Sequence, residues 1–145
     1  MGKMTFLDKK EDKDLKNKIE ELTGTMDQIT LVTWATDCAE HVLSHFEEEY
    51  PEDNRPRKAI EAGRAWVHGK VSVSEARFAA FAAHAAARDA DEGSVAVAVA
   101  RAAGHAAATV HVAGHAVHAA NYAATSISKE RTWQYQHLLD LKGNS

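Results

Sequence analysis

Apolar residues recur every three or four positions along most of this chain, which is the spacing of one buried face of an α-helix. The clearest example lies within residues 27–49 and comprises Ile29, Val32, Ala39, Val42 and Phe46. The one alternating stretch, SVAVAVA at 94–100, is apolar on both faces and continues directly into alanine-rich sequence. Its alanine content favours a helix, so the pattern predicts helices and no sheet.

Glycines, prolines and capping residues divide the chain into helix-length segments. The predicted helices cover residues 9–22, 27–49, the stretch from an Asp53 or Asn54 cap to His68, 73–90, 94–124 and 128–141. Ser72 and Glu75 have the spacing of a capping box at the start of the fourth helix. We predict a charged N-terminal arm or weak helix over residues 1–26 and a helical-bundle domain over residues 27–145.

Alanine sets the character of the predicted centre, since it supplies 23 of the 49 residues from Ala76 to Ala124. Alanine has high helix propensity but little side chain to bury, so such helices gain stability by approaching one another closely. Large residues must then fill the remaining space, and the candidates are Trp34, Phe46, Trp66, Phe78, Phe81 and Trp133. The predicted fold is all-α: a single compact antiparallel bundle of five to six helices with a closely packed, Ala-rich centre.

The charge balance argues against two classes of partner. The 145 residues carry a formal net charge of −4, which provides no field to attract nucleic acid or anionic lipid.

The long apolar segment 94–124 contains Arg101, four histidines and Asn121, so we expect no membrane span there. Cys38 is the only cysteine, and the opening MGKMTFLDKK lacks the apolar run of a secretory signal. We therefore expect a cytoplasmic protein.

Four histidines within residues 101–122 raise the question of a metal site. On a continuous helix, His111 and His115 have the i, i+4 spacing of a ligand pair, and His84 or Asp37 would have to complete the site. The alternative is a buried polar network between helices. Its candidate members are Asp37, Glu40, Arg57, Arg64, His84, Arg88, Arg101 and His105. The chain lacks Cys-x-x-Cys and His-Glu-x-x-His motifs, so we favour the network and expect no cofactor, with a divalent metal as the alternative.

The segment EEEYPED, residues 47–53, concentrates acidic side chains where the second predicted helix ends. The candidate partner-binding residues are Glu47, Glu48, Glu49, Glu52 and Asp53. Such a run is either a solvated helix end or a contact surface for a basic protein.

Several segments together resemble a known bacterial family. They are DCAEHVLSHFEEEYPEDNRPRKAIEAGRAW at 37–66, EARFAAFAAHAAARDA at 75–90, ARAAGHAAATVHVAGHAVHAANYA at 100–123 and KERTWQ at 129–134. Arg-Pro-Arg at 55–57, Arg-Ala-Trp at 64–66 and Ala-Gly-His at 103–105 are the most distinctive pieces. The chain resembles immunity proteins of the group named after the fifth immunity-protein type of polymorphic toxin systems.

This resemblance implies an antidote that binds and blocks a cognate protein toxin inside the producing cell, without catalysis of its own. The alternative is that the chain is a metal-binding helical-bundle protein, for example a metal-dependent hydrolase. Homo-oligomerisation also stays open, because helix faces made of small residues pack well between copies of a chain.

Overall fold

The computed structural model describes residues 5–125 and 127–143, and this part of the chain forms eight helices and no strand. The helices are α1 (Phe6–Thr23), α2 (Gln28–Val42), α3 (Ser44–Glu47), α4 (Arg55–Val67), α5 (Val73–Asp89), α6 (Val95–Ala108), α7 (His115–Thr125) and α8 (Glu130–Gly143). The all-α prediction is confirmed, but the number of helices exceeds the predicted five to six. None of the helices in the described ranges is long and apolar enough to cross a membrane.

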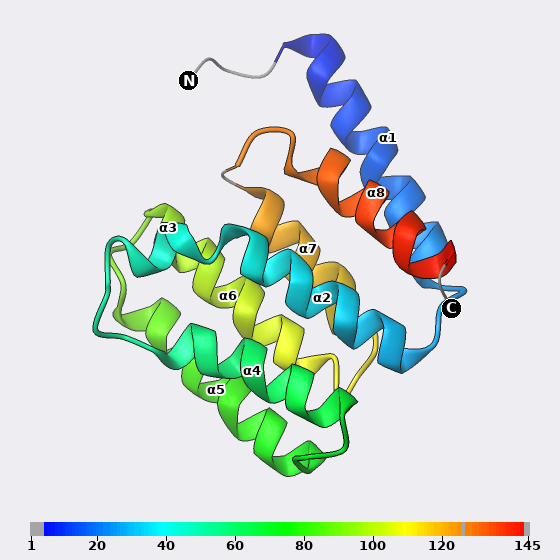
Figure 1. The fold of residues 1–145 in the computed structure, drawn as a ribbon. Coiled ribbons are helices and arrows are strands. Elements are labelled where there is room, and N and C mark those ends of the chain that lie inside the picture. The colour runs from blue at the N-terminus through cyan, green and yellow to red at the C-terminus, as the bar shows by residue number, and fades with distance from the viewer. Residues whose placement is uncertain (1–4, 126, 144–145) are drawn as a thin grey trace.

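Helix α6 lies at the centre of the bundle (Figure 1). It packs against α2 and α4 on one side and lies between α5 and α7 on the other. Helices α1 and α8 pack together beside α7 and α2. The bundle therefore has one layer formed by α5, α6 and α7, whose outer surface faces away from α2 and α4.

Alanine forms much of the interior, as the composition predicts. The buried side of α5 consists of Ala76, Ala80, Ala83, Ala86 and Ala87, and this side meets α4 and α6. Such short side chains let the backbones approach closely and leave no room for a phenyl ring between the helices. Phe78 and Phe81 consequently point outward and are 78% and 61% exposed, so their prediction as core residues is wrong.

The other predicted core aromatics lie inside or at the edge of the core. Trp34 and Phe46 are fully buried, and the Trp34 indole nitrogen donates a hydrogen bond to the backbone carbonyl of Gln134, 2.9 Å away. Trp66 and Trp133 are partly buried and pack against the two apolar clusters of the bundle. These rings fill the space that the alanines leave beside α2.

The two longest predicted helices are each interrupted. The first divides at Leu43 into α2 and α3. The second ends at Ala108, and six residues separate it from the start of α7 at His115. After Ala108 the helix tightens, because the amides of Val110 and His111 bond to carbonyls three residues back. The side-chain amide of Gln28 donates to the carbonyls of Thr109 and Val110, 3.1 and 2.7 Å away. This tertiary cap satisfies carbonyls that the helix end exposes, so the chain can turn and α7 can pack against α6.

Within the predicted N-terminal arm or weak helix, residues Phe6–Thr23 form helix α1. Thr5 and Asp8 make a capping box at its start, and Ile19 is buried near its end. Asp12 accepts a hydrogen bond from the Arg131 guanidinium at 2.9 Å, which ties α1 to α8. The Asp12–Arg131 ion pair and the buried Ile19 thus help attach helix α1 to the bundle.

Candidate functional site

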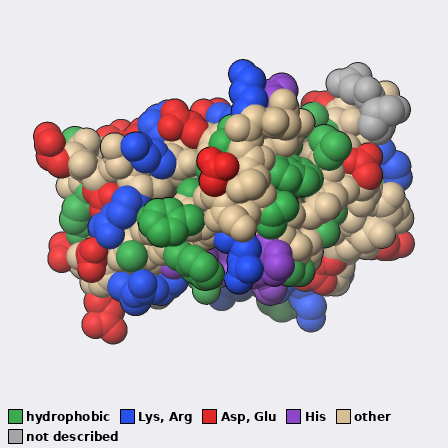
Figure 2. Space-filling view, turned by 90° about the horizontal axis from the view of Figure 1, so that it is seen from below, with side chains coloured by type: hydrophobic (Ala, Val, Ile, Leu, Met, Phe, Trp, Pro, Cys, Tyr) green, Lys and Arg blue, Asp and Glu red, His purple; other side chains and the backbone are tan. Residues whose placement is uncertain are grey.

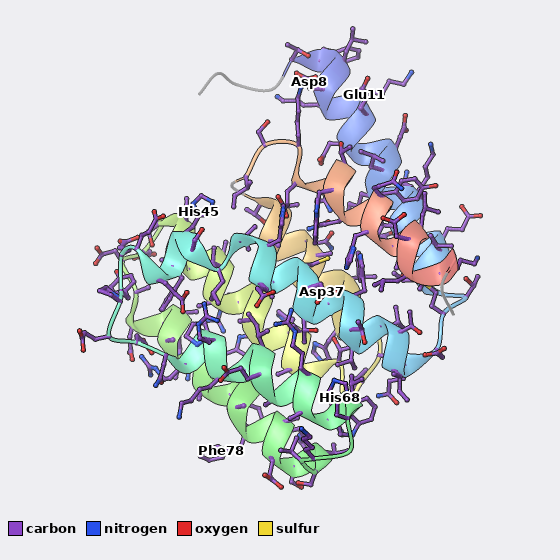
Figure 3. All side chains as sticks on the ribbon, in the orientation of Figure 1. Asp8, Glu11, Asp37, His45, His68 and Phe78 are labelled. Atoms are coloured by element: carbon purple, nitrogen blue, oxygen red, sulfur yellow. The ribbon has the colours of Figure 1, made fainter. Side chains whose placement is uncertain are left out.

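Carboxylates, arginine and histidine meet where α2, α4 and α8 come together, and we call this cluster the paired region. It comprises Asp37, Glu40, Arg64 and His137. The Arg64 guanidinium donates to an oxygen of Asp37 and to an oxygen of Glu40, each 2.8 Å away. The second oxygen of Asp37 lies 2.8 Å from Nε2 of His137. Asp37 lies near the middle of α2, as Figure 3 shows, so it connects three helices.

The paired region continues along α8 as a stack of rings. The rings of His41 and Trp133 are 3.8 Å apart and nearly parallel, and Trp133 stacks on His137 at 4.8 Å. His41 Nδ1 also lies 2.5 Å from a carboxylate oxygen of the buried Glu130. Each charged group of this region therefore has a partner of opposite charge or a ring beside it, which makes the region a structural junction between helices.

The acidic segment 47–53 is partly neutralised within the chain. Arg57 donates two hydrogen bonds of 2.6 Å to Glu47, and Arg55 does the same to Asp53 at 2.9 and 2.7 Å. These hydrogen bonds hold the pKa of both carboxyl groups below their usual values. The remaining candidate contact residues are Glu48, Glu49 and Glu52, and all three are exposed.

Four histidines from α5, α6 and α7 gather on the outer surface of that layer, and we call them the histidine cluster. They are His84, His105, His115 and His118. The ring of His105 is central: its centroid lies 4.9 Å from that of His84, 5.1 Å from that of His115 and 5.3 Å from that of His118. Its Nδ1 lies 2.9 Å from Nδ1 of His115, so one of the two rings donates an N–H hydrogen bond to the other.

Arg101 and Gly104 fix the position of His84 in this cluster. An Nη of Arg101 donates to Nδ1 of His84 at 2.9 Å, which requires a lone pair on that nitrogen and therefore a neutral ring. Gly104 leaves room for the imidazole, because a Cβ at this position would lie 2.7 Å from two of the ring atoms. Both Arg101 and Gly104 belong to α6, so this helix holds a ring that α5 supplies.

Burial and nearby positive charge lower the pKa of three histidines of the cluster, His84, His105 and His115. Burial first, and then the charge of Arg101, lowers the pKa of His84 to about 4. Burial and the neighbouring rings, His84 first among them, lower the pKa of His105 to about 4. The pKa of His115 is also lowered, mainly by burial and by His118. The permanent positive charges beside His84 are those of Arg101 and Arg88.

The outer side of α5 extends this surface. Phe78 points away from the bundle, as Figure 3 shows, and Phe81 follows one turn later with the Arg77 guanidinium 5.8 Å from its ring centroid. Arg88 is exposed one turn after His84, and Tyr122 of α7 stacks on His105 at 5.3 Å. Figure 2, seen from the side where α5 lies in Figure 1, shows hydrophobic, Lys or Arg, and His side chains next to one another.

We call this combined surface the α5–α7 face. It comprises Arg77, Phe78, Phe81, His84 and Arg88 of α5, Arg101 and His105 of α6, and His115, His118 and Tyr122 of α7.

The predicted metal ligands are not brought together. His111 lies exposed in the turn before α7, and Asp37 belongs to the paired region, where it bonds to Arg64 and His137. The i, i+4 relation of His111 to His115 on one helix is wrong, because α7 begins only at His115. Within residues 5–125 and 127–143, no group of three or more potential ligands is arranged to hold a metal ion.

The predicted buried network divides into separate clusters. Asp37, Glu40 and Arg64 belong to the paired region, and His84, Arg101 and His105 to the α5–α7 face, while Arg57 pairs with Glu47. The prediction that the members of this network are buried is wrong for Glu40, Arg57 and Arg88, which are exposed. Long charged side chains at helix surfaces reach partners without leaving water, so pairing does not require burial.

His118 and Tyr122 were not among the predicted site residues. A continuous helix over residues 94–124 places them on a different side from His105, but the turn after Ala108 brings all three together. The β-branched residues Thr109, Val110 and Val112, followed by Gly114, are the signal in the sequence that marks this interruption.

Comparison with known proteins gives one informative match. A family model described as "Imm-5 like putative immunity protein" matches residues 21–141. This range contains helices α2 to α7, most of α8, the paired region and the α5–α7 face. The chain has no significant match among curated proteins or among solved structures.

Proposed function

The chain belongs to the Imm-5 like immunity-protein family, and from this premise we propose that it binds a cognate protein toxin in the cytoplasm of the producing cell. Binding neutralises the toxin by covering its active surface, and the chain itself catalyses no reaction. The observation that carries the proposal is the extent of the family match, residues 21–141, which includes nearly all of the bundle.

Two properties of the bundle support a binding role. Charged junctions and close alanine packing hold its helices together, so it can offer a preformed surface at a small entropic cost on binding. Cys38, the single thiol of the chain, is fully buried, and burial raises its pKa well above the usual value. A buried thiol of high pKa is a poor nucleophile, which agrees with a function that does not depend on cysteine chemistry.

The acidic segment is one candidate contact for a basic toxin surface. Glu48, Glu49 and Glu52 are exposed and available, whereas Glu47 and Asp53 already bind arginines of the same chain. Three clustered carboxylates would accelerate association with a positively charged partner and would lose that effect in high salt.

Co-expression tests the proposed function. The product of the neighbouring reading frame is expressed in a heterologous host, alone and together with this chain, and growth is measured. We expect growth arrest alone, recovery with this chain, and a stable complex of the two purified proteins by size-exclusion chromatography. If no neighbouring product is toxic and none binds, the proposed function is wrong. A variant with Trp34→Asp, which disrupts the core, is the control that should fail to rescue growth.

A further inference from the structure

We propose that the α5–α7 face is the surface through which this chain binds its toxin, and that the toxin presents carboxylates to it beside exposed apolar groups. This inference rests on the proposed function and adds the location of the contact and the chemistry of the partner. Three independent features of the face carry it: its arginines, its exposed aromatic rings and its cluster of histidines.

The arginines of this face differ from those elsewhere. The sequence contains seven arginines, and four of them form ion pairs with carboxylates: Arg55, Arg57, Arg64 and Arg131. The other three are Arg77, Arg88 and Arg101. All three belong to the α5–α7 face, and within the described residues none of them forms an ion pair. Their guanidinium groups therefore remain available to carboxylates of a partner.

Exposed aromatic rings lie between these arginines. Phe78 is 78% exposed and Phe81 is 61% exposed, although both are attached to a well-packed helix. Tyr122, which is 38% exposed, adds a third ring on α7. Aromatic residues and arginine are enriched where binding energy concentrates in protein interfaces, whereas glutamate is depleted there. By this criterion the α5–α7 face is a better main contact than the acidic segment 47–53.

The histidine cluster collects positive or neutral groups without a carboxylate among them. The groups facing it are His84 and Arg88 from α5, Arg101 and His105 from α6, His111 from the turn, and His115, His118 and Tyr122 from α7. The nearby acids lie at the end of α5, where Asp89 pairs with Arg55, and in the following turn. A carboxylate placed beside Arg101 would offset the charge of Arg101 and attract a proton to the nearby rings, which opposes the effect of burial and favours their protonation.

The negative net charge of the molecule favours one orientation of an acidic partner during binding. The whole chain carries a net charge of −4, and its acidic groups therefore repel an acidic partner that approaches elsewhere. The α5–α7 face is the complementary surface, because its three arginines form no ion pair with a described carboxylate and lie around exposed aromatic rings. Charge complementarity of this kind selects orientation as well as partner.

Calorimetric titration of the purified toxin with variants of this chain tests the location. The face variants are Phe81→Ala and Arg88→Glu, and the matched controls are Ile29→Ala and Lys58→Glu, which change exposed residues on α2 and α4. Because a contact residue at the centre of an interface accounts for a tenfold or larger effect, we expect each face variant to weaken binding by about tenfold or more. Each control should stay within about twofold of the wild type, and circular dichroism should show the same helix content for all.

The dependence of binding on pH tests the chemistry of the partner. If a carboxylate enters beside the histidine cluster, complex formation takes up protons, and affinity should rise as the pH falls from 8 to 6. Titration in two buffers of different ionisation enthalpy measures the proton uptake. His105→Gln, which keeps the size and removes the titrating group, should reduce the uptake and flatten the dependence on pH.

The outcomes separate the two proposals. If the wild-type chain neither binds nor rescues, the proposed function falls and this inference with it. If the wild type binds but Phe81→Ala and Arg88→Glu leave the affinity unchanged, only the location is wrong, and a loss with Glu48→Lys would assign the contact to the acidic segment. If light scattering shows a dimer of the free chain that these face variants dissociate, the occupant is a second copy and the inference is overturned.

Discussion

Arginine has opposite surroundings on the two sides of this bundle. In the paired region, Arg64 is held between Asp37 and Glu40 and serves to join α2 to α4. On the α5–α7 face, Arg101 donates to a neutral imidazole, and no carboxylate among the described residues forms an ion pair with it. Charges that stabilise a fold are satisfied within the chain, whereas charges left without counter-ions beside exposed aromatic rings are available to another molecule. The comparison therefore separates a structural region from a candidate contact surface.

The largest expected effect concerns the close packing behind the paired region. A Cβ on Gly63 would lie 2.8 Å from a methyl group of the fully buried Thr36. The Thr36 hydroxyl donates to the carbonyl of Val32 at 2.8 Å, and its β-branched side chain has little freedom to move. Gly63→Ala should therefore lower the free energy of unfolding by about 2 kcal/mol, as measured by urea denaturation.

The matched substitution on the other side is Gly104→Ala. Here the new methyl group meets the ring of His84, which is partly exposed and can rotate away at the expense of its hydrogen bond to Arg101. Alanine favours the helix over glycine by about 1 kcal/mol at both positions, so the difference lies in the neighbour that must move. The His84 ring can move more easily than the buried Thr36, and the net loss should therefore be smaller than for Gly63→Ala. Equal losses at the two glycines would contradict the picture of a tight junction opposite an adaptable surface.

Acid should weaken the fold through the α5–α7 face. The pKa of His84 and of His105 is about 4 in the folded chain, against 6.5 for an unperturbed histidine. Between these values the unfolded chain binds more protons than the folded chain, so the stabilisation is complete above about pH 6.5 and is lost as the pH falls toward 4. After discounting for the partial exposure of both rings, we expect a loss of about 1–2 kcal/mol between pH 7 and 5.

Thermal melts of the wild type and of the double variant His84→Gln, His105→Gln measure this effect. The variant should lose less stability between pH 7 and 5 than the wild type, because the groups that take up protons on unfolding are absent. An identical pH profile for the two proteins would show that His84 and His105 are not held neutral in the folded state.

Breaking the paired region should have a smaller effect. The side chains of Arg64 and Asp37 are 34% and 27% exposed, so water screens their attraction. A double-mutant cycle with Arg64→Gln and Asp37→Asn should give a coupling energy of about 0.5–1 kcal/mol. The same cycle with Arg88→Gln and Asp37→Asn should give a coupling near zero, because Arg88 belongs to the other face. A large coupling in the second cycle would remove the distinction between the two regions.

Local patterns predicted the elements better than the site, for physical reasons that particular residues make clear. The capping box of Ser72 and Glu75 depends on four consecutive residues, and the structure contains it. The end of α6, by contrast, depends on Gln28, whose side chain caps carbonyls 81 and 82 positions later in the sequence. Periodicity assigns Phe81 to a helix but cannot tell which neighbour that helix will meet.

The same limit applied to the site. The sequence nominated His84, Arg101 and His105 for one polar network together with Asp37 and Arg64. Only the packing of α5 and α7 on either side of α6 separates these two groups, and that arrangement arises from tertiary contacts. Residue types therefore identified many of the participants, while their grouping required the fold.

Of these changes, treatment with a metal chelator should have the smallest effect on the stability of the fold. The Arg101 guanidinium next to His84 is a permanent positive charge, and it disfavours a second cation within the histidine cluster. A metal bound only to the folded state would stabilise it by mass action, so dialysis against EDTA should change the melting temperature by less than about 1 °C. Elemental analysis of protein purified without a polyhistidine tag provides the control. Stoichiometric zinc that depends on His115, with a lower melting temperature after chelation, would show that this face binds a cation and would contradict its assignment as a surface for carboxylates.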